Sequence, residues 1–180
     1  MDRDRFWMLI DTARTAGGDC EELTAHLVAL LTGLPANEIV AFQQLLDELL
    51  AESFRYTLWG AAVLINAGCS DDGFEDFRGW LIAQGRQVYE AALQDPDSLS
   101  LHPQVRNLDP RRMWPTMLDC QPLLAAAWEA YRATTGQEFP SEDLPWPPRD
   151  PGPAWDFDDH AEMRQRYPKL WTRLGWDTAF

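Results

Sequence analysis

The side chains best suited to chemistry gather in one segment, between Gly68 and Arg86. Three aspartates in this segment offer clustered carboxylates, which can bind a hard cation or divide acid and base roles between them. Two arginines offer guanidinium groups, which bind anionic groups through paired hydrogen bonds. The candidate ligand-binding residues are Asp71, Asp72, Asp76, Arg78, Trp80 and Arg86.

Arg78 also has a structural interpretation. On a helix that begins at Phe74, it falls near the middle of an apolar arc, so its guanidinium must be paired. The pattern predicts a carboxylate partner, with Asp71 and Asp72 nearest in sequence, or several backbone carbonyls. A buried structural contact is the favoured interpretation, and an anion site shared with Arg86 is the alternative.

Helix capping is the simpler interpretation of the acidic cluster. Ser70, Asp71 or Asp72 can accept hydrogen bonds from the first turn of the helix, and Glu75 stands where a capping box with Asp72 requires it. Neighbouring carboxylates raise the pKa of the Cys69 thiol, which argues against a reactive nucleophile.

Trp80 is one of nine tryptophans, more than a core of this size requires. Tryptophan is enriched at interfaces and pockets. Helical spacing places Trp80 on the side of Asp76, away from Arg78. We expect Trp80 either to face a groove or to pack beneath the proline-rich segment described below.

The sequence contains none of the common catalytic or metal-binding motifs. The acidic run from Asp156 to Glu162 fails as a calcium loop, because Ala161 and Tyr167 stand where glycine and glutamate are needed. A helix N-terminus explains these acids. The histidines lie far apart, and both the nucleophile elbow and the phosphate loops are absent. The sequence predicts neither a metal nor a cofactor, and it leaves open whether the protein is an enzyme.

Composition narrows the classes of partner. With 15 Lys and Arg against 29 Asp and Glu, the net charge of −14 disfavours nucleic acids and anionic membranes. The longest apolar stretch is shorter than the ~20 residues that span a bilayer, and the N-terminus does not resemble a secretory signal. Cys20, Cys69 and Cys120 are odd in number and widely spaced, which predicts three reduced thiols in the cytoplasm.

Helical periodicity runs through most of the chain and predicts an all-α fold. Apolar stripes indicate helices near residues 4–16, 20–34, 35–49, 54–66, 74–84, 86–93 and 122–135. Prolines between Pro140 and Pro153 predict an extended strap, followed by a terminal helical stretch interrupted at Pro168. We therefore expect a compact multi-helix domain over residues 1–138. The strap and terminal helix, residues 139–180, should pack on this domain.

The stretch GCSDDGFEDFRGWLIAQGR, residues 68–86, resembles a bacterial family known only as a domain of unknown function. The opening Phe6-Trp7-x-x-Ile10 and the later run from Asp95 to Leu99 resemble the same family. The resemblance covers roughly the first 140 residues of the chain. The resemblance implies a small actinobacterial protein and carries no established activity.

Two hypotheses of function follow. The first is a binding or regulatory module whose acidic, tryptophan-rich surface engages a protein partner with a basic patch, because charge steers such a partner to it. The second is an enzyme or a binder of a small anionic ligand that uses the segment between Gly68 and Arg86.

Overall fold

The protein is all-α, as the periodicity predicts. The computed structural model describes residues 1–109, 117–141, 147 and 150–176, which contain helices and no strand. The helices are α1 (Arg3–Thr15), α2 (Cys20–Thr32), α3 (Ala36–Glu52), α4 (Tyr56–Asn66), α5 (Asp71–Ala83), α6 (Arg86–Gln94), the 3-10 helix η1 (Pro96–Leu101), α7 (Pro103–Arg106), α8 (Gln121–Thr135), α9 (His160–Arg166) and α10 (Pro168–Arg173).

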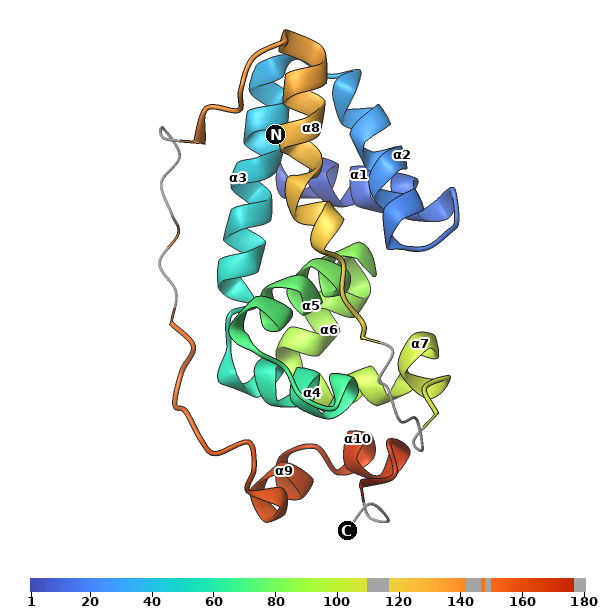
Figure 1. Ribbon diagram of the computed structural model, residues 1–180, viewed down its shortest axis with the longest axis vertical. Coiled ribbons are helices and arrows are strands. Elements are labelled where there is room, and N and C mark those ends of the chain that lie inside the picture. The colour runs from blue at the N-terminus through green and yellow to red at the C-terminus, as the bar shows by residue number, and fades with distance from the viewer. Residues whose placement is uncertain (110–116, 142–146, 148–149, 177–180) are drawn as a thin grey trace.

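Helix α8 organises the upper half of the molecule. It runs beside the long helix α3 and also packs on α2 and α5 (Figure 1). Helices α4, α5 and α6 lie below this group, and α9 and α10 form the opposite end of the molecule. The large side chains of the core, among them Phe6, Phe42, Phe74 and Phe77, are fully buried. The chain therefore has enough apolar contact to hold the helices in fixed positions.

Most helix ends follow local signals. The side chains of Asp19 and Asp159 cap α2 and α9, and Gly136 ends α8 in the left-handed conformation. The start of α5 differs from the expectation, because the helix begins at Asp71 and not at Phe74. Ser70 caps it by accepting a hydrogen bond from Gly73 N at 3.2 Å, so the first helical turn includes residues expected in a loop.

The approach to α8 is fixed by two close contacts. The side chain of Asn66 accepts from Leu118 N at 2.9 Å and donates to Leu118 O at 3.3 Å. Gly79 of α5 lies so close to Cys120 that an added Cβ would sit 2.7 Å from the Cys120 carbonyl oxygen. A glycine at this position therefore lets the start of α8 rest directly on α5.

The segment after α8 contacts the body at its far end. Asp97 is buried and accepts hydrogen bonds from Lys169 N and Leu170 N at 3.0 and 2.8 Å, at the start of α10. Tyr167 donates to Thr57 O at 2.6 Å, and Gly60 leaves room for the Tyr167 ring. The break at Pro168 separates α9 from α10, where the sequence predicts an interruption.

Candidate functional site

Arg78 lies inside the core and binds backbone, so its structural interpretation fits its surroundings. Its side chain donates to Leu50 O and, at 3.3 Å, to Phe74 O. The guanidinium also lies over the Phe54 and Phe74 rings, with Cζ 5.2 and 5.0 Å from their centroids. Backbone carbonyls are among the partners that the sequence predicts.

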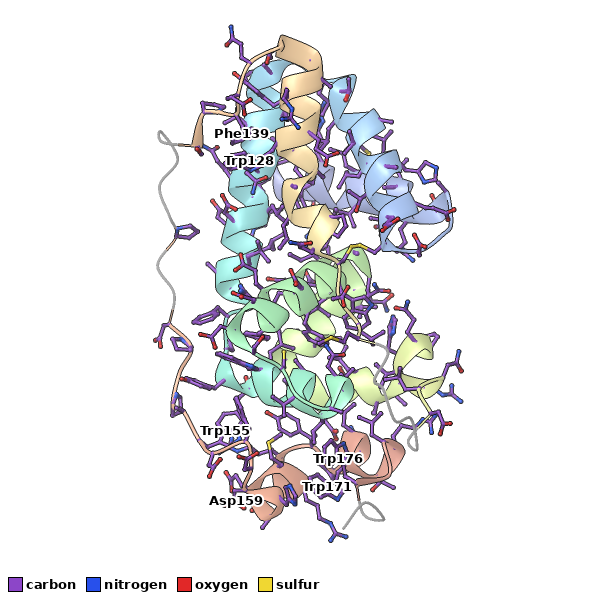
Figure 2. The ribbon with its side chains drawn as sticks, viewed as in Figure 1. Trp128, Phe139, Trp155, Asp159, Trp171 and Trp176 are labelled. Carbon is purple, nitrogen blue, oxygen red and sulfur yellow. A yellow bond between two sulfur atoms is a disulfide. The ribbon has the colours of Figure 1, made fainter. Side chains whose placement is uncertain are left out.

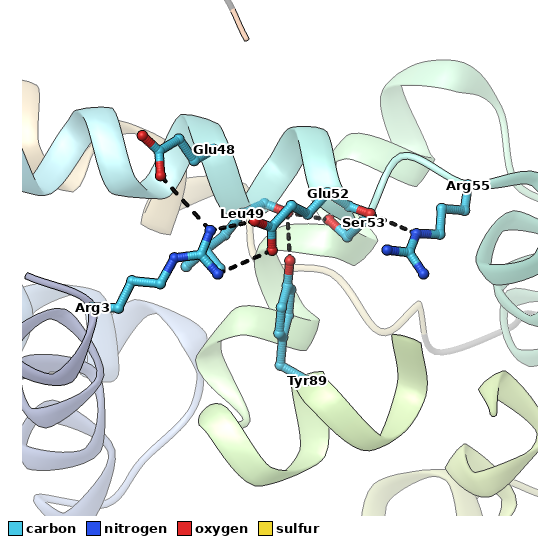
Figure 3. Close-up of polar contacts among 7 residues, drawn as sticks. All are labelled: Arg3, Glu48, Leu49, Glu52, Ser53, Arg55 and Tyr89. Carbon is cyan, nitrogen blue, oxygen red and sulfur yellow. Dashed lines mark hydrogen bonds and ion pairs between the residues drawn. The ribbon is translucent and has the colours of Figure 1, made fainter. Parts of the chain in front are cut away.

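The contact with Leu50 belongs to a larger cap at the end of α3. The last carbonyls of a helix have no partner within the helix, so other groups must satisfy them. Tyr89 donates to Leu49 O at 2.6 Å, and Arg55 Nε donates to Glu52 O at 2.8 Å (Figure 3). Burial raises the pKa of the Tyr89 phenol, which keeps it a donor. Together with Arg78, these side chains close α3 at the point where the chain turns toward α4.

The polar groups of two other candidate residues, Arg86 and Trp80, bind other side chains of the protein. Arg86 pairs with Glu90 and Asp4, each at 2.7 Å, on the surface where α6 meets α1. Trp80 is buried, and its indole donates to Gln104 Oε1 at 2.8 Å. The ring packs edge-on against His102.

Cys69 is not poised for nucleophilic chemistry. Burial, reinforced by the negative charge of Asp76, raises the pKa of its thiol to about 12. The direction agrees with the sequence argument. The main cause differs, because the apolar surroundings contribute more than the neighbouring carboxylate.

The structure gathers a different set of residues into a groove between α3, α5 and α8. Its volume is about 820 Å³. Two of the predicted site residues, Asp72 and Asp76, line it, and Asp71, Arg78, Trp80 and Arg86 are not among its lining. The described lining also includes Gln43, Asp47 and Leu50 from α3, Glu75 from α5, Gln121, Pro122, Leu124, Ala125, Trp128 and Glu129 from α8, and Ser141 and Pro147.

The groove is acidic. Five carboxylates line it, and no lysine or arginine stands among its described lining residues. Burial raises the pKa of Asp76, and the charges of Asp119, Glu75 and Asp72 raise it further. Like charges repel one another, so this lining favours a cationic ligand over an anionic one.

Two lining residues add polar and aromatic character. Gln43 is 6 % exposed, and its amide donates to Asp47 Oδ1 at 2.8 Å, while Gln43 Oε1 has no hydrogen-bond partner among the described residues. Trp128 is 42 % exposed and stacks on Phe139 with ring centroids 4.9 Å apart (Figure 2). Sequence reasoning missed both residues. The i and i+4 spacing of Gln43 and Asp47 was the available signal.

The expectation of three reduced thiols is wrong for two of them. Cys20 and Cys120 form a disulfide that joins the start of α2 to the residue before α8. The two residues are separated by 100 positions, so no local spacing pattern predicts the pair. Packing of α8 on α2 brings their Cα atoms to 5.6 Å, a normal separation for a bridge. Cys69 is free.

The described part of the chain contains neither a metal-binding cluster nor a membrane-spanning helix. Within it, no group of three or more His, Cys, Asp or Glu residues is arranged to hold a metal ion. Among the described residues, no helix is long and apolar enough to cross a bilayer.

These features define an all-α protein with an acidic groove between three of its helices. The model of the family DUF4240, "Protein of unknown function", matches residues 1–133. Because the match spans more than half of the chain, the chain belongs to this family, which confirms the predicted kinship with a domain of unknown function. No curated protein and no solved structure matches the chain.

Proposed function

We propose that this protein is a bacterial, cytoplasmic binding module whose acidic groove engages a basic segment of a protein partner. The observation that carries the proposal is the groove itself, with five carboxylates and an exposed tryptophan and with no basic side chain in its described lining. Complementary charge steers a basic partner to such a surface and orients it there.

Charge also separates this proposal from its alternative. A small anionic ligand between Gly68 and Arg86 requires a free guanidinium, whereas Arg78 is buried on carbonyls and Arg86 is paired with two carboxylates. The carboxylates of the groove repel an anion. The arrangement of these residues therefore supports the protein partner better than the anionic ligand.

The disulfide bears on the proposed location. Structural disulfides are uncommon in reducing cytoplasm, so the bridge needs protection there. Cys120 is fully buried, which limits access of a reductant to one of its two sulfur atoms. Alkylation of thiols in intact cells tests the location, because a bridge that remains oxidised in the cytoplasm leaves Cys69 as the only reactive site.

The binding test uses a fluorescent peptide rich in lysine and fluorescence anisotropy. The variant Asp72→Asn/Glu75→Gln removes two charges from the groove and should weaken binding about fivefold, with the loss shrinking as salt is added. The matched control is Glu21→Gln/Glu22→Gln. It also removes two acids near the start of a helix, outside the groove, and should bind like the wild type.

The outcome decides between the candidate functions. An equal loss in both variants would reduce the interaction to overall charge and refute a groove. If inorganic phosphate raises the melting temperature and the lysine peptide does not, the anionic-ligand alternative is supported instead.

The pH dependence supplies a second readout of the same site. The pKa of Asp76 is raised, so this carboxyl keeps its proton to a higher pH than an ordinary aspartate. The groove therefore gains negative charge as pH rises through that pKa, and peptide binding should strengthen in the same interval. Asp76→Asn should flatten this part of the profile, and a binding curve independent of pH would contradict the assignment.

A further inference from the structure

We propose that the groove selects arginine, so that the partner inserts a guanidinium against Gln43 Oε1, the groove carboxylates and the face of Trp128. This inference rests on the proposed function and specifies the side chain that the groove recognises. It is argued from three properties of the lining: an unused buried acceptor, an exposed aromatic ring, and a set of carboxylates of which some are partly buried and others exposed.

Gln43 points to a ligand that donates hydrogen bonds. Its side chain is held in place by the bond to Asp47, yet its own oxygen is buried without a donor among the described residues. A buried acceptor without a partner destabilises the folded state, so such atoms are rare in folded proteins. A ligand that supplies an N–H group here removes that penalty on binding.

Trp128 points to a flat cation. Trp128 is 42 % exposed, although it is a large hydrophobic side chain. The Phe139 ring stacks on the Trp128 ring at an interplanar angle of 22°. This contact holds the indole at one orientation while part of it stays open to solvent. A guanidinium stacks well on such a face, because it is planar and weakly hydrated.

Arginine satisfies the lining better than lysine does. Its guanidinium carries five N–H donors in one plane and can address an amide oxygen and carboxylates together. The lysine ammonium is a compact, strongly hydrated charge that gains little from the ring and loses more hydration in a partly buried groove.

The chain uses the same contact elsewhere. Arg166 Cζ lies 4.1 Å from the centroid of the Trp155 ring, and its Nε donates to Glu162 at 2.7 Å. This protein therefore already contains an arginine that contacts an aromatic face and a carboxylate at the same time. In the groove, Trp128 and Asp76 offer the same combination to an arginine from another chain.

The test compares two peptides of equal length and charge, whose basic residues are all arginine or all lysine. Isothermal titration at elevated salt should give about tenfold tighter binding of the arginine peptide, because screening suppresses contributions from charge alone. Gln43→Met keeps the side-chain volume and removes the acceptor, and Trp128→Leu removes the ring. Each should lower affinity for the arginine peptide about fivefold and change affinity for the lysine peptide less than about twofold.

Two further measurements keep the result interpretable. Gln43→Met eliminates an unpaired buried oxygen and also the hydrogen bond to Asp47, two effects of opposite sign, so its melting temperature should change little and a folded variant is expected. Trp128→Phe retains an aromatic face and should recover part of the preference for arginine. Spermine, a small polycation without a guanidinium, should compete more weakly than the arginine peptide.

The outcomes separate this inference from the function on which it rests. Equal binding of both peptides overturns arginine selection and leaves the basic partner in place, whereas binding of neither overturns the proposed function as well. A preference that survives in Gln43→Met and Trp128→Leu would mean that these residues do not create it. Competition by spermine at equal strength would assign the groove to small polycations.

Discussion

Reduction of the Cys20–Cys120 bridge should lower the stability of this protein by a predictable amount. The bridge connects positions 100 residues apart, so it closes a loop over more than half of the chain. In the folded state α2 and α8 already pack together, and the bridge adds little to that contact. Its main effect is on the unfolded chain, whose freedom it restricts.

The magnitude follows from the length of the loop. Loop-closure entropy for about 100 residues corresponds to about 4.7 kcal/mol, and measured values for disulfides are commonly about 2–4 kcal/mol. For a chain of this size, 1 kcal/mol shifts the melting temperature by about 2–4 °C. We therefore expect reduction to lower the melting temperature by about 5–15 °C.

The assay compares oxidised and reduced wild type by thermal unfolding followed by circular dichroism. Cys20→Ala/Cys120→Ala should melt near the reduced wild type, and Cys69→Ala serves as the control that removes a sulfur outside the bridge. Thiol titration in denaturant establishes the starting state. One thiol should react before reduction, and all three after it.

Two results would refute this reasoning. Three reactive thiols in protein purified without reductant would show that the bridge does not form. Equal melting temperatures of oxidised and reduced protein, with the bridge present by titration, would show that the loop does not restrict the unfolded chain.

Two further predictions concern buried charged residues. Arg78→Met retains the apolar stem but removes the donor to Leu50 O, and urea unfolding should show a loss of about 2 kcal/mol. Arg86→Ala, at an exposed ion pair, should lose much less stability, and similar losses in both variants would contradict a buried cap. Asp97→Ala removes the acceptor for two backbone N–H groups of α10, and we expect a loss of about 2 kcal/mol together with faster proteolysis after α9. Asp97→Asn keeps a side-chain oxygen, so its stability should lie between those of the wild type and Asp97→Ala. Unchanged proteolysis in Asp97→Ala would exclude the proposed cap.

The sequence predicts the features of the fold that depend on neighbours in the chain. Apolar periodicity locates the helices, and short signals such as Asp19, Asp159 and Gly136 locate several of their ends. The start of α5 was missed because Asp71, Asp72 and Gly73 are typical of loops, while Ser70 provides a cap upstream of them.

The candidate site depends on contacts that no local pattern records. Arg78 required a partner, but its contact with Leu50 joins residues 28 positions apart. The groove likewise requires Gln43 of α3, Asp76 of α5 and Trp128 of α8 to meet through helix packing. Asp72 and Asp76 were predicted because they lie on one short acidic stretch, whereas the other groove residues come from distant segments.

The contact between Asp97 and α10 makes the C-terminal helices an intramolecular ligand of the rest of the chain. The segment after α8 tethers α9 and α10 beside their docking surface, so their effective concentration there is on the order of millimolar. Contacts too weak to hold a separate peptide are then sufficient to keep α10 on Asp97. A free peptide with the sequence of α9 and α10 should consequently fail to displace them at micromolar concentration. Cleavage of the tether should release them on dilution.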